Sequence, residues 1–325
     1  MIGSPVKQLN LADSAFSNRK KRSRTEKQLD EINAFIDWSK LVKKVEKTYK
    51  KSKRGRPSIP IIYMLKILIL QRLYDLSDPE MEDALIDRLS FQRFVGFSFS
   101  EEVPDFSTIW RFRERLVKAE LIDELFDEVL QMIEQTGHRL VRGKMTLVDA
   151  TIVPASRKAP KEDEPQSPQK DADARATKKG NKGYFGYKGH VGVNQETGIV
   201  HSARFTAANV HDSQEFDALL TGQEQAVFAD KAYDSADRKR HFRRQGIYYG
   251  IMEKAHRNRP LSKAQKTLNR HKSRIRCQVE RVFAQLKRWY GYTRVRYVNH
   301  GRNKLQFLLL CMIYNIRRAL TLVAA

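Results

Sequence analysis

Three acidic residues stand out because each lies in a segment where a carboxylate is unfavourable unless it is paired, binds a cation or takes part in a reaction. Asp149 sits within the apolar run MTLVDATIV (residues 145–153), and Asp230 directly follows the apolar run AVFA. Glu280 lies inside a strongly basic region. An acid in an apolar segment destabilises a fold unless it is paired or bound to a cation. Carboxylate oxygens are the ligands that hard divalent ions prefer, so the three acids together indicate a metal-dependent centre.

The segment Arg274–Tyr290, RIRCQVERVFAQLKRWY, predicts an amphipathic helix, because its apolar residues form one stripe at about 100° per residue. Arg276, Glu280 and Lys287 lie along one edge of that stripe. Residues 238–302 contain twenty Lys or Arg and only two acids, one of them Glu280. Two interpretations remain open here. Glu280 either pairs with neighbouring arginines on the helix surface or holds a divalent ion against a phosphate.

Carboxylates from two strands and one helix could converge on two divalent ions about 3.5–4 Å apart. Such a pair would activate water or a 3′-hydroxyl and stabilise the leaving oxygen of a phosphodiester, without a covalent nucleophile. The spacing of the acids alone is weak evidence, since many α/β proteins carry acids at strand ends. The basic helix strengthens this interpretation, because its charge suits a phosphate-bearing substrate.

The composition favours a DNA-binding protein of the cytoplasm. A net charge of +23 and a pI near 10.0 favour nucleic acid over an anionic membrane surface. The two cysteines, Cys277 and Cys311, have no CxxC spacing, which excludes a zinc finger and indicates a reducing compartment. The first ten residues contain no apolar run, and the apolar runs at 61–70 and 307–316 are too short to span a bilayer.

The chain divides into three expected parts. Residues 1–24 end in the cluster RKKRSR and predict a basic flexible arm. Residues 25–140 predict an all-helical, DNA-binding domain, and residues 141–325 predict an α/β catalytic domain. The expected helices of the first domain lie at 26–49, 59–73 and 78–89 and in a run from 105 towards 137.

Five strands are expected in the catalytic domain, at 145–153, 184–194, 198–206, 226–229 and 247–252, with a last helix at 305–322. Residues 157–183 contain much Pro, Asp, Lys and Gly and no large apolar residue, which predicts a mobile loop.

Several other polar residues allow two interpretations. Arg111, Arg113 and Arg115 could contact DNA or form a solvated helix face. Asp212, with His211, could assist a metal site or simply cap a short helix. His190 and His201 lie on expected strands and are predicted to be packing residues.

Six motifs in order resemble the DDE transposases of bacterial insertion sequences, in the group named for insertion sequence five. They are VPDFSTIWRFRERL (103–116), LVDATIV (147–153), YFGYKGH (184–190), TAANVHDS (206–213), FADKAYDS (228–235) and RIRCQVERVFAQLKR (274–288). The resemblance covers most of the chain, and as an ordered set the motifs are highly specific.

The resemblance implies an RNase-H-like, retroviral-integrase-like α/β catalytic core with an all-helical N-terminal domain. It implies that Asp149, Asp230 and Glu280 are both catalytic residues and metal ligands. The family signature around the glutamate is Tyr, two residues, Arg, three residues, Glu, six residues, Lys. Arg276, Glu280 and Lys287 match it, while Ser273 stands in place of the tyrosine.

The resemblance further implies that Arg276 and Lys287 hold DNA phosphates near the scissile bond. Further DNA-contact candidates are Lys231, Tyr233, Tyr187 and Lys188, for which ordinary packing at strand ends is an equally good interpretation.

The implied function is DNA transposition with two Mg²⁺ ions, for which Mn²⁺ would substitute. The partners would be double-stranded DNA, comprising terminal inverted repeats and target DNA, and a second copy of the chain in a homodimer on DNA. The enzyme would act in the bacterial cytoplasm, at the nucleoid when bound to DNA. Two alternatives remain: a nuclease of the same fold that cuts without joining, and an inactive DNA-binding protein derived from a transposase.

Overall fold

The computed structural model describes residues 21–49, 58–98, 101–136, 144–158, 170–255 and 259–324. It divides the chain into two compact units, Met1–Met132 and Ile133–Val323. The expected basic arm at 1–24 lies almost entirely outside the described residues. Each unit is described by itself below.

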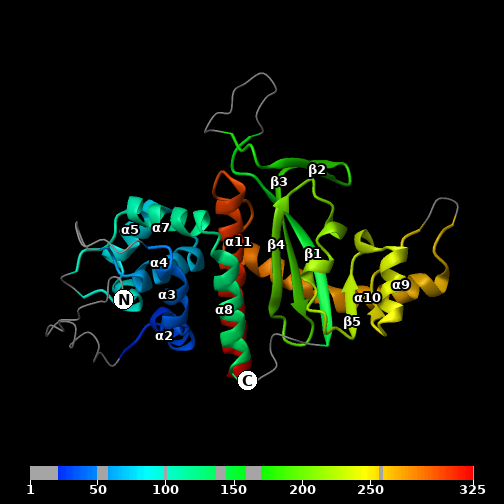
Figure 1. The fold of residues 1–325 in the computed structure, drawn as a ribbon, viewed down its shortest axis with the longest axis horizontal. Helices are drawn as coiled ribbons and strands as arrows, with labels where there is room; N and C mark the ends of the chain where they lie inside the picture. The colour runs from blue at the N-terminus through cyan, green and yellow to red at the C-terminus, as the bar shows by residue number, and fades with distance from the viewer. Residues whose placement is uncertain are drawn as a thin grey trace. The chain divides into compact units, whose positions relative to one another are not determined.

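The first unit is helical throughout its described residues (Figure 1). The helix expected at 26–49 is in fact two helices, because the Asp37 side chain accepts a hydrogen bond from the Ser39 backbone N–H at 3.1 Å and starts a new helix. The helices are α2 (Arg24–Phe35), α3 (Trp38–Glu46), α4 (Ile61–Leu73), α5 (Asp78–Asp87), α6 (Leu89–Val95), α7 (Phe106–Lys118) and α8 (Ile122–Glu134).

Arg113 anchors the interior of this helical unit. Its guanidinium makes two hydrogen bonds to the Asp78 carboxylate, at 2.6 and 2.7 Å, and its side chain is 2% exposed. Gln71 donates a further bond to Asp78 at 2.6 Å, so that α4, α5 and α7 meet at one half-buried carboxylate. Arg115 lies over the Tyr49 ring at 3.9 Å. Neither interpretation from the sequence therefore fits Arg113, which is a structural residue of the core.

The second unit is built on a mixed sheet of six strands (Figure 1). Its neighbours run in the order β2-β3-β1-β5-β6, and β4 also pairs with β3. β1 pairs with β3, and β3 with β4, in antiparallel fashion, whereas β1, β5 and β6 are parallel. The strands are β1 (Met145–Pro154), β2 (Arg175–Lys179), β3 (Lys182–Asn194), β4 (Val200–Ala207), β5 (Ala226–Ala229) and β6 (Tyr248–Tyr249).

The strand β2 corrects part of the mobile-loop prediction for residues 157–183. Residues 159–169 lie outside the described residues, but Arg175–Lys179 pairs with the start of β3 as a hairpin. Gly180 closes the turn at a φ of +61°, a conformation that glycine adopts without strain. The composition hid this strand because it is polar and mostly exposed, so it lacks the apolar alternation of a half-buried strand.

Helices and short 3₁₀ segments pack against the sheet. α10 (Lys263–Trp289) contacts β1 and β5, and α11 (His300–Val323) contacts β4. The Asn315 side chain fastens α11 to β4 by bonding both the N–H and the C=O of Val200, at 2.9 and 2.7 Å. By length and composition α11 would pass as a membrane span, but 67% of its most apolar window is buried inside the protein. α11 is therefore a core helix of this unit.

An apolar cluster joins β1 and β5 to the segments that follow the strands. It brings together Val148, Phe216, Leu219, Val227, Ala229, Tyr233, Phe242 and Ile251. Three of the elements that follow the strands contribute to this cluster: η2 (Asp217–Leu219), η3 (Lys231–Tyr233) and α9 (Ala236–Arg244). A further 3₁₀ segment, η1 (Asp212–Gln214), contacts η3. Side chains alternate along β1, so Val148 and Asp149 point to opposite faces of the sheet.

Candidate active site

The pairing of β1 with β5 places Asp149 beside Asp230. The strands run parallel, and the last pair in their register is Val148 with Ala229. Each aspartate is the next residue of its strand, so both follow that pair at the same level of the sheet. β1 continues through Asp149, which pairs with Val191 of β3. β5 ends, and the Asp230 carboxylate accepts the Lys231 N–H at 2.7 Å at the start of η3.

Arg276 connects Asp149 to Glu280. From α10, its guanidinium donates to the Asp149 carboxylate at 2.9 Å and to the Glu280 carboxylate at 2.5 Å. The side chains of Arg276 and Asp149 are 14% and 18% exposed, whereas that of Glu280 is 56% exposed. A pair between Glu280 and a neighbouring arginine on the helix was one of the two interpretations of the sequence. Arg276 forms this pair and also binds Asp149, so it connects α10 to β1.

The electrostatics of the site indicate that Asp230 lies near Asp149 and Arg276. The pKa of Asp149 is raised to about 6, mainly by burial, which Arg276 and the Ala150 N–H oppose and to which the negative charges of Asp230 and Glu280 add. Burial of Arg276 opposes its charge, but Asp149, Glu280 and Asp230 outweigh that effect and raise the pKa of the guanidinium. Three carboxylates therefore act on one cation.

The donor chemistry of these residues fits a divalent ion. The site offers carboxylate oxygens, and a doubly charged ion would offset both the burial that raises the pKa of Asp149 and the smaller repulsion from Asp230 and Glu280. Among the residues that the structure describes, however, no three acidic, histidine or cysteine side chains are grouped closely enough to hold one metal ion. The structure brings Asp149 and Glu280 to the Arg276 guanidinium, with Asp230 beside them.

Two of the DNA-contact candidates, Lys231 and Lys287, are exposed. Partial burial of its ammonium group and the charge of Lys179 lower the pKa of Lys287. Neither Lys287 nor Lys179 has a carboxylate within 4 Å in the described part of the chain. Sequence reasoning missed Lys179, although the run Lys178-Lys179-Gly-Asn-Lys182 signals a basic turn.

The other three candidates, Tyr187, Tyr233 and Lys188, are buried in this structure. Tyr187 is fully buried and donates its hydroxyl to Asp171 at 2.7 Å. Tyr233 is 1% exposed and packs on the ring of Phe216. Lys188 pairs with Asp212 at 2.8 Å and donates to a backbone carbonyl. These contacts favour the packing interpretation, which the sequence left equally open, for these three residues.

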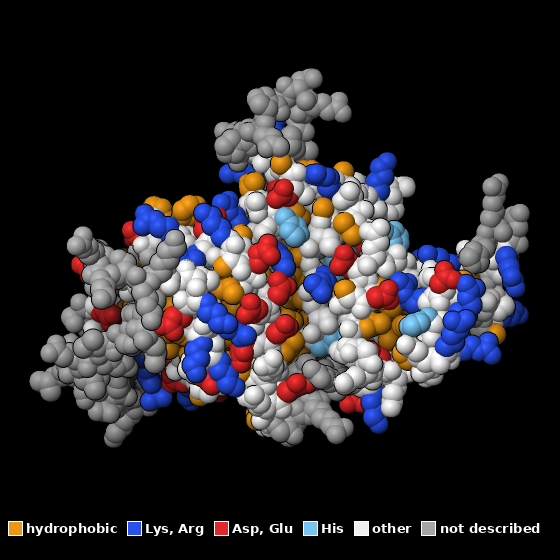
Figure 2. All heavy atoms as spheres, viewed as in Figure 1, with side chains coloured by type: hydrophobic (Ala, Val, Ile, Leu, Met, Phe, Trp, Pro, Cys, Tyr) orange, Lys and Arg blue, Asp and Glu red, His pale blue; other side chains and the backbone are white. Residues whose placement is uncertain are grey.

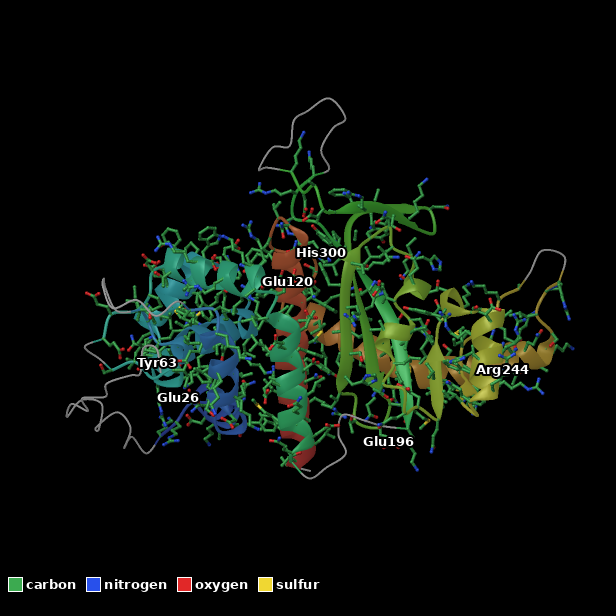
Figure 3. All side chains as sticks on the ribbon, viewed as in Figure 1. Glu26, Tyr63, Glu120, Glu196, Arg244 and His300 are labelled. Atoms are coloured by element: carbon green, nitrogen blue, oxygen red, sulfur yellow. The ribbon has the colours of Figure 1, made fainter. Side chains whose placement is uncertain are left out.

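The remaining polar residues of the motifs are also placed. Asp212 pairs with Lys188, whereas the cap of η1 is His211. His190 and His201 are buried, as expected for packing residues, and burial lowers the pKa of each to about 4, so both rings are neutral at pH 7. Near the top of α11, His300 donates its backbone N–H to Asp173 at 2.9 Å (Figure 3).

Comparison with known proteins identifies the class to which this fold and site belong. The family described as "Transposase DDE domain" matches residues 142–316, and "Transposase domain (DUF772)" matches residues 17–115. The first match covers more than half of the chain, so the chain belongs to the transposase DDE domain family. It is a DDE transposase, an enzyme of DNA transposition.

One solved structure is also similar, that of a piggyBac transposase synaptic complex with hairpin DNA. The match has a TM-score of 0.47 and 10% sequence identity, and it covers 90% of this chain and 73% of that chain.

Proposed function

We propose that the chain is an insertion-sequence transposase that binds the terminal inverted repeats of its own element. It cleaves DNA there and joins the ends to target DNA. The observation that carries this proposal is that Arg276 binds both Asp149, within β1, and Glu280, while Asp230 follows β5 at the level of Asp149. The motifs that resemble the insertion-sequence-five group support that group, and three antiparallel strands followed by two parallel ones support an RNase-H-like core.

Asp149, Asp230 and Glu280 are the proposed metal ligands, and Mg²⁺ is the proposed ion, with Mn²⁺ as a substitute. When bound, such ions activate water or a 3′-hydroxyl and stabilise the leaving oxygen of the phosphodiester. β1 and the start of η3 hold the two aspartates at fixed backbone positions, whereas Glu280 is more exposed and lies on α10. Glu280 is therefore the ligand with most freedom to adjust.

Arg276, Lys287 and Lys231 are the proposed phosphate contacts. Arg276 presents a planar guanidinium that suits a phosphate, while the two lysines are exposed charges. α9 adds exposed Lys239, Arg240, Arg243 and Arg244, and Figure 2 shows Lys and Arg gathered over this helix. This distribution supports binding to double-stranded DNA, with an affinity that falls as salt is added.

Joining two ends of one element needs two active sites, which supports a homodimer on DNA. Activity on chromosomal DNA places the enzyme in the bacterial cytoplasm. Both statements depend on the proposed reaction.

The test is cleavage of a duplex that carries the DNA end flanking the gene, with Mg²⁺ or Mn²⁺. The natural protein, Glu280→Gln and Glu196→Gln are compared. Glu196 is an exposed glutamate at the turn after β3, labelled in Figure 3, and serves as the matched control. We expect metal-dependent cutting and strand transfer by the natural protein and the control, and DNA binding without cutting by Glu280→Gln.

The other outcomes separate the alternatives. Cutting without a strand-transfer product would identify a nuclease of the same fold. Binding without metal-dependent cutting by all three proteins would contradict the enzymatic proposal and favour an inactive DNA-binding protein.

A further inference from the structure

The solvent-facing side of α10 carries a row of cations that the proposed active site does not use. α10 runs unbroken from Lys263 to Trp289, and at about 100° per residue its surface Lys and Arg point in two different directions. Six exposed residues within about 60° of Lys263 form the outer row of α10: Lys263, Lys266, Arg270, Arg274, Arg281 and Arg288. Arg276 and Lys287 lie about 120–140° away from Lys263 and do not belong to it.

The outer row lies opposite the face by which α10 packs on the rest of its unit. Figure 1 shows α10 crossing the sheet, and the helix contacts β1 and β5. The side chains buried in its second half lie about 100–200° from Lys263 on the helix: Val279, Val282, Phe283 and Leu286. In the first half Lys272 is buried on that side, where Gln265 also donates to Glu253 at 2.7 Å. The outer row therefore faces away from the protein along the whole helix.

No acid accompanies the cations of the outer row. An ordinary solvated helix face mixes charges of both signs, which pair at a spacing of three or four residues. Among the residues that the structure describes, no carboxylate lies within 4 Å of any of these six side chains. Lys266, Arg270 and Arg274 follow one another at intervals of four residues, so like charges are neighbours and repel one another. A row that destabilises the free helix in this way indicates a polyanionic ligand.

The dimensions and residue types of the outer row fit the backbone of a DNA duplex. At 1.5 Å per residue the row is about 37 Å long, which is about one turn of B-DNA. The side chains between the cations on this face are short: Thr267, Cys277 and Ala284. Contacts from Lys and Arg to phosphates position a duplex but do not read its sequence. The outer row therefore suits DNA that is bound without regard to sequence.

The outer row and the active-site edge of α10 suit two different duplexes. Glu280 lies about 100° from the centre of the row, on the same side as Arg276 and Lys287, so a straight duplex held along one direction cannot also lie along the other. The row also extends past Glu280 both ways, by about 26 Å in one direction and about 12 Å in the other. A DNA end stops at the active site, whereas a target duplex continues on both sides of the point of attack.

We propose that the outer row of α10 binds target DNA, as a second duplex held beside the flanking end. The inference rests on the proposed function, in which Arg276 and Lys287 contact the end and the end is joined to a target. The row holds the target by its phosphates, independently of sequence, and aligns an internal stretch of it with Glu280. Loss of the row should therefore weaken binding of the second duplex and leave binding of the end unchanged.

Two full-length double variants test the row against a matched loss of charge. The row variant combines Arg274→Gln with Arg281→Gln, which lie on either side of Glu280 along α10. The control variant combines Arg204→Gln with Lys144→Gln, two exposed cations that also have no carboxylate within 4 Å in the described residues. Side chains alternate along a strand, so Arg204 of β4 points to the face of the sheet away from Asp149 and α10.

The experiment measures binding of two duplexes in turn by fluorescence anisotropy, with a chelator present so that no reaction occurs. The first is the labelled flanking-end duplex. The second is a labelled duplex of unrelated sequence, added to protein already saturated with the unlabelled end. We expect both variants to bind the end as the natural chain does, and the row variant alone to bind the second duplex at least tenfold more weakly.

Salt dependence and strand transfer give two further readouts. The slope of log K against log salt concentration for the second duplex should be smaller by about 2 in the row variant, about 1 for each lost phosphate contact. With Mg²⁺ the row variant should cleave the end at the natural rate and form at least tenfold less strand-transfer product at low target concentration. The control variant should match the natural chain in both.

Three results would overturn the inference. If the row variant loses affinity for the flanking end as strongly as for the second duplex, the outer row binds the end of the element. If it binds the second duplex as the natural chain does, the row is an ordinary solvated face. If the control variant loses as much affinity as the row variant, only the net charge matters. Because binding is measured without turnover, a natural chain that fails to cleave would contradict the proposed function, while the second-duplex comparison still decides whether the row binds DNA.

Discussion

Replacing Asp149 by asparagine should make the stability of the metal-free protein less sensitive to rising pH. Burial, with the charges of Asp230 and Glu280, raises the pKa of Asp149 from 3.8 to about 6 in the folded protein. The folded state therefore keeps a proton that the unfolded chain has already lost between about pH 4 and pH 6. The stability that this group contributes is complete below about pH 4 and is lost as the pH rises through about 6.

The size of the effect follows from the two pKa values. The difference between 3.8 and about 6 corresponds to about 3 kcal/mol, which is an upper value because the site relaxes when it ionises. An asparagine side chain at this position would resemble the protonated carboxyl and would not ionise. The free energy of unfolding of Asp149→Asn minus that of the natural chain should therefore increase by up to about 3 kcal/mol between about pH 4 and about pH 8.

The assay is urea unfolding in the presence of a chelator at several values of pH across this range. Asp217→Asn is the control, because Asp217 is 79% exposed and its nearest cation, Arg238, is 3.6 Å away. We expect no pH-dependent difference for the control. A difference between Asp149→Asn and the natural chain that stays constant with pH, or decreases as the pH rises, would refute the reasoning.

Three further predictions concern the core. Arg113→Met leaves the half-buried Asp78 without its bidentate charge partner and should lower the free energy of unfolding by about 1–3 kcal/mol, measured by urea titration. Gly189→Ala would place a methyl group 2.6 Å from the Phe307 ring and should cost about 1–3 kcal/mol, measured by thermal unfolding. In the native protein a thiol reagent should modify Cys277, which is exposed, but not Cys311, whose burial raises the pKa of its thiol.

The first two of these predictions have matched controls. Arg111→Met changes an exposed arginine on the same helix as Arg113 and should leave stability nearly unchanged. Gly183→Ala adds a methyl group with no atom within 4 Å. If a variant and its control lost the same amount of stability, the contacts assigned to Arg113 or Gly189 would be contradicted. Modification of both cysteines before unfolding would contradict the burial of Cys311.

The central strands could be predicted from the sequence because each is a short apolar run with a clear end. The run 145–153 became β1 with one residue added, and 226–229 became β5 without change. Helix boundaries that depend on a single cap were harder to predict. The apolar stripe continues through Ile36, and an aspartate such as Asp37 is typical both of a helix N-cap and of an exposed position inside a helix, so its type alone does not mark the break.

The site was predictable as a set of chemical types but not as a set of contacts. The three carboxylates and the adjacent cation of α10 could be identified from the sequence, because an acid in an apolar or strongly basic segment is unusual and calls for a specific role. That Arg276 reaches across to Asp149 depends on how α10 packs on the sheet, which no local pattern contains. The burial of Tyr187 and Tyr233 could not be predicted for the same reason. A tyrosine in such a motif can pack in the core or contact a ligand, and its residue type does not distinguish the two.

The register of β1 and β5 has an evolutionary consequence. Asp149 and Asp230 are separated by 80 intervening residues, yet their alignment depends only on the pairing from Met145–Ala226 to Val148–Ala229. The connecting chain can therefore gain or lose residues without moving the two acids, provided that neither strand changes in length. One residue inserted within Ala226–Ala229 would instead shift Asp230 by about 3.3 Å and turn it to the other face of the sheet. Related proteins should differ in length between the strands and keep the strands themselves free of insertions.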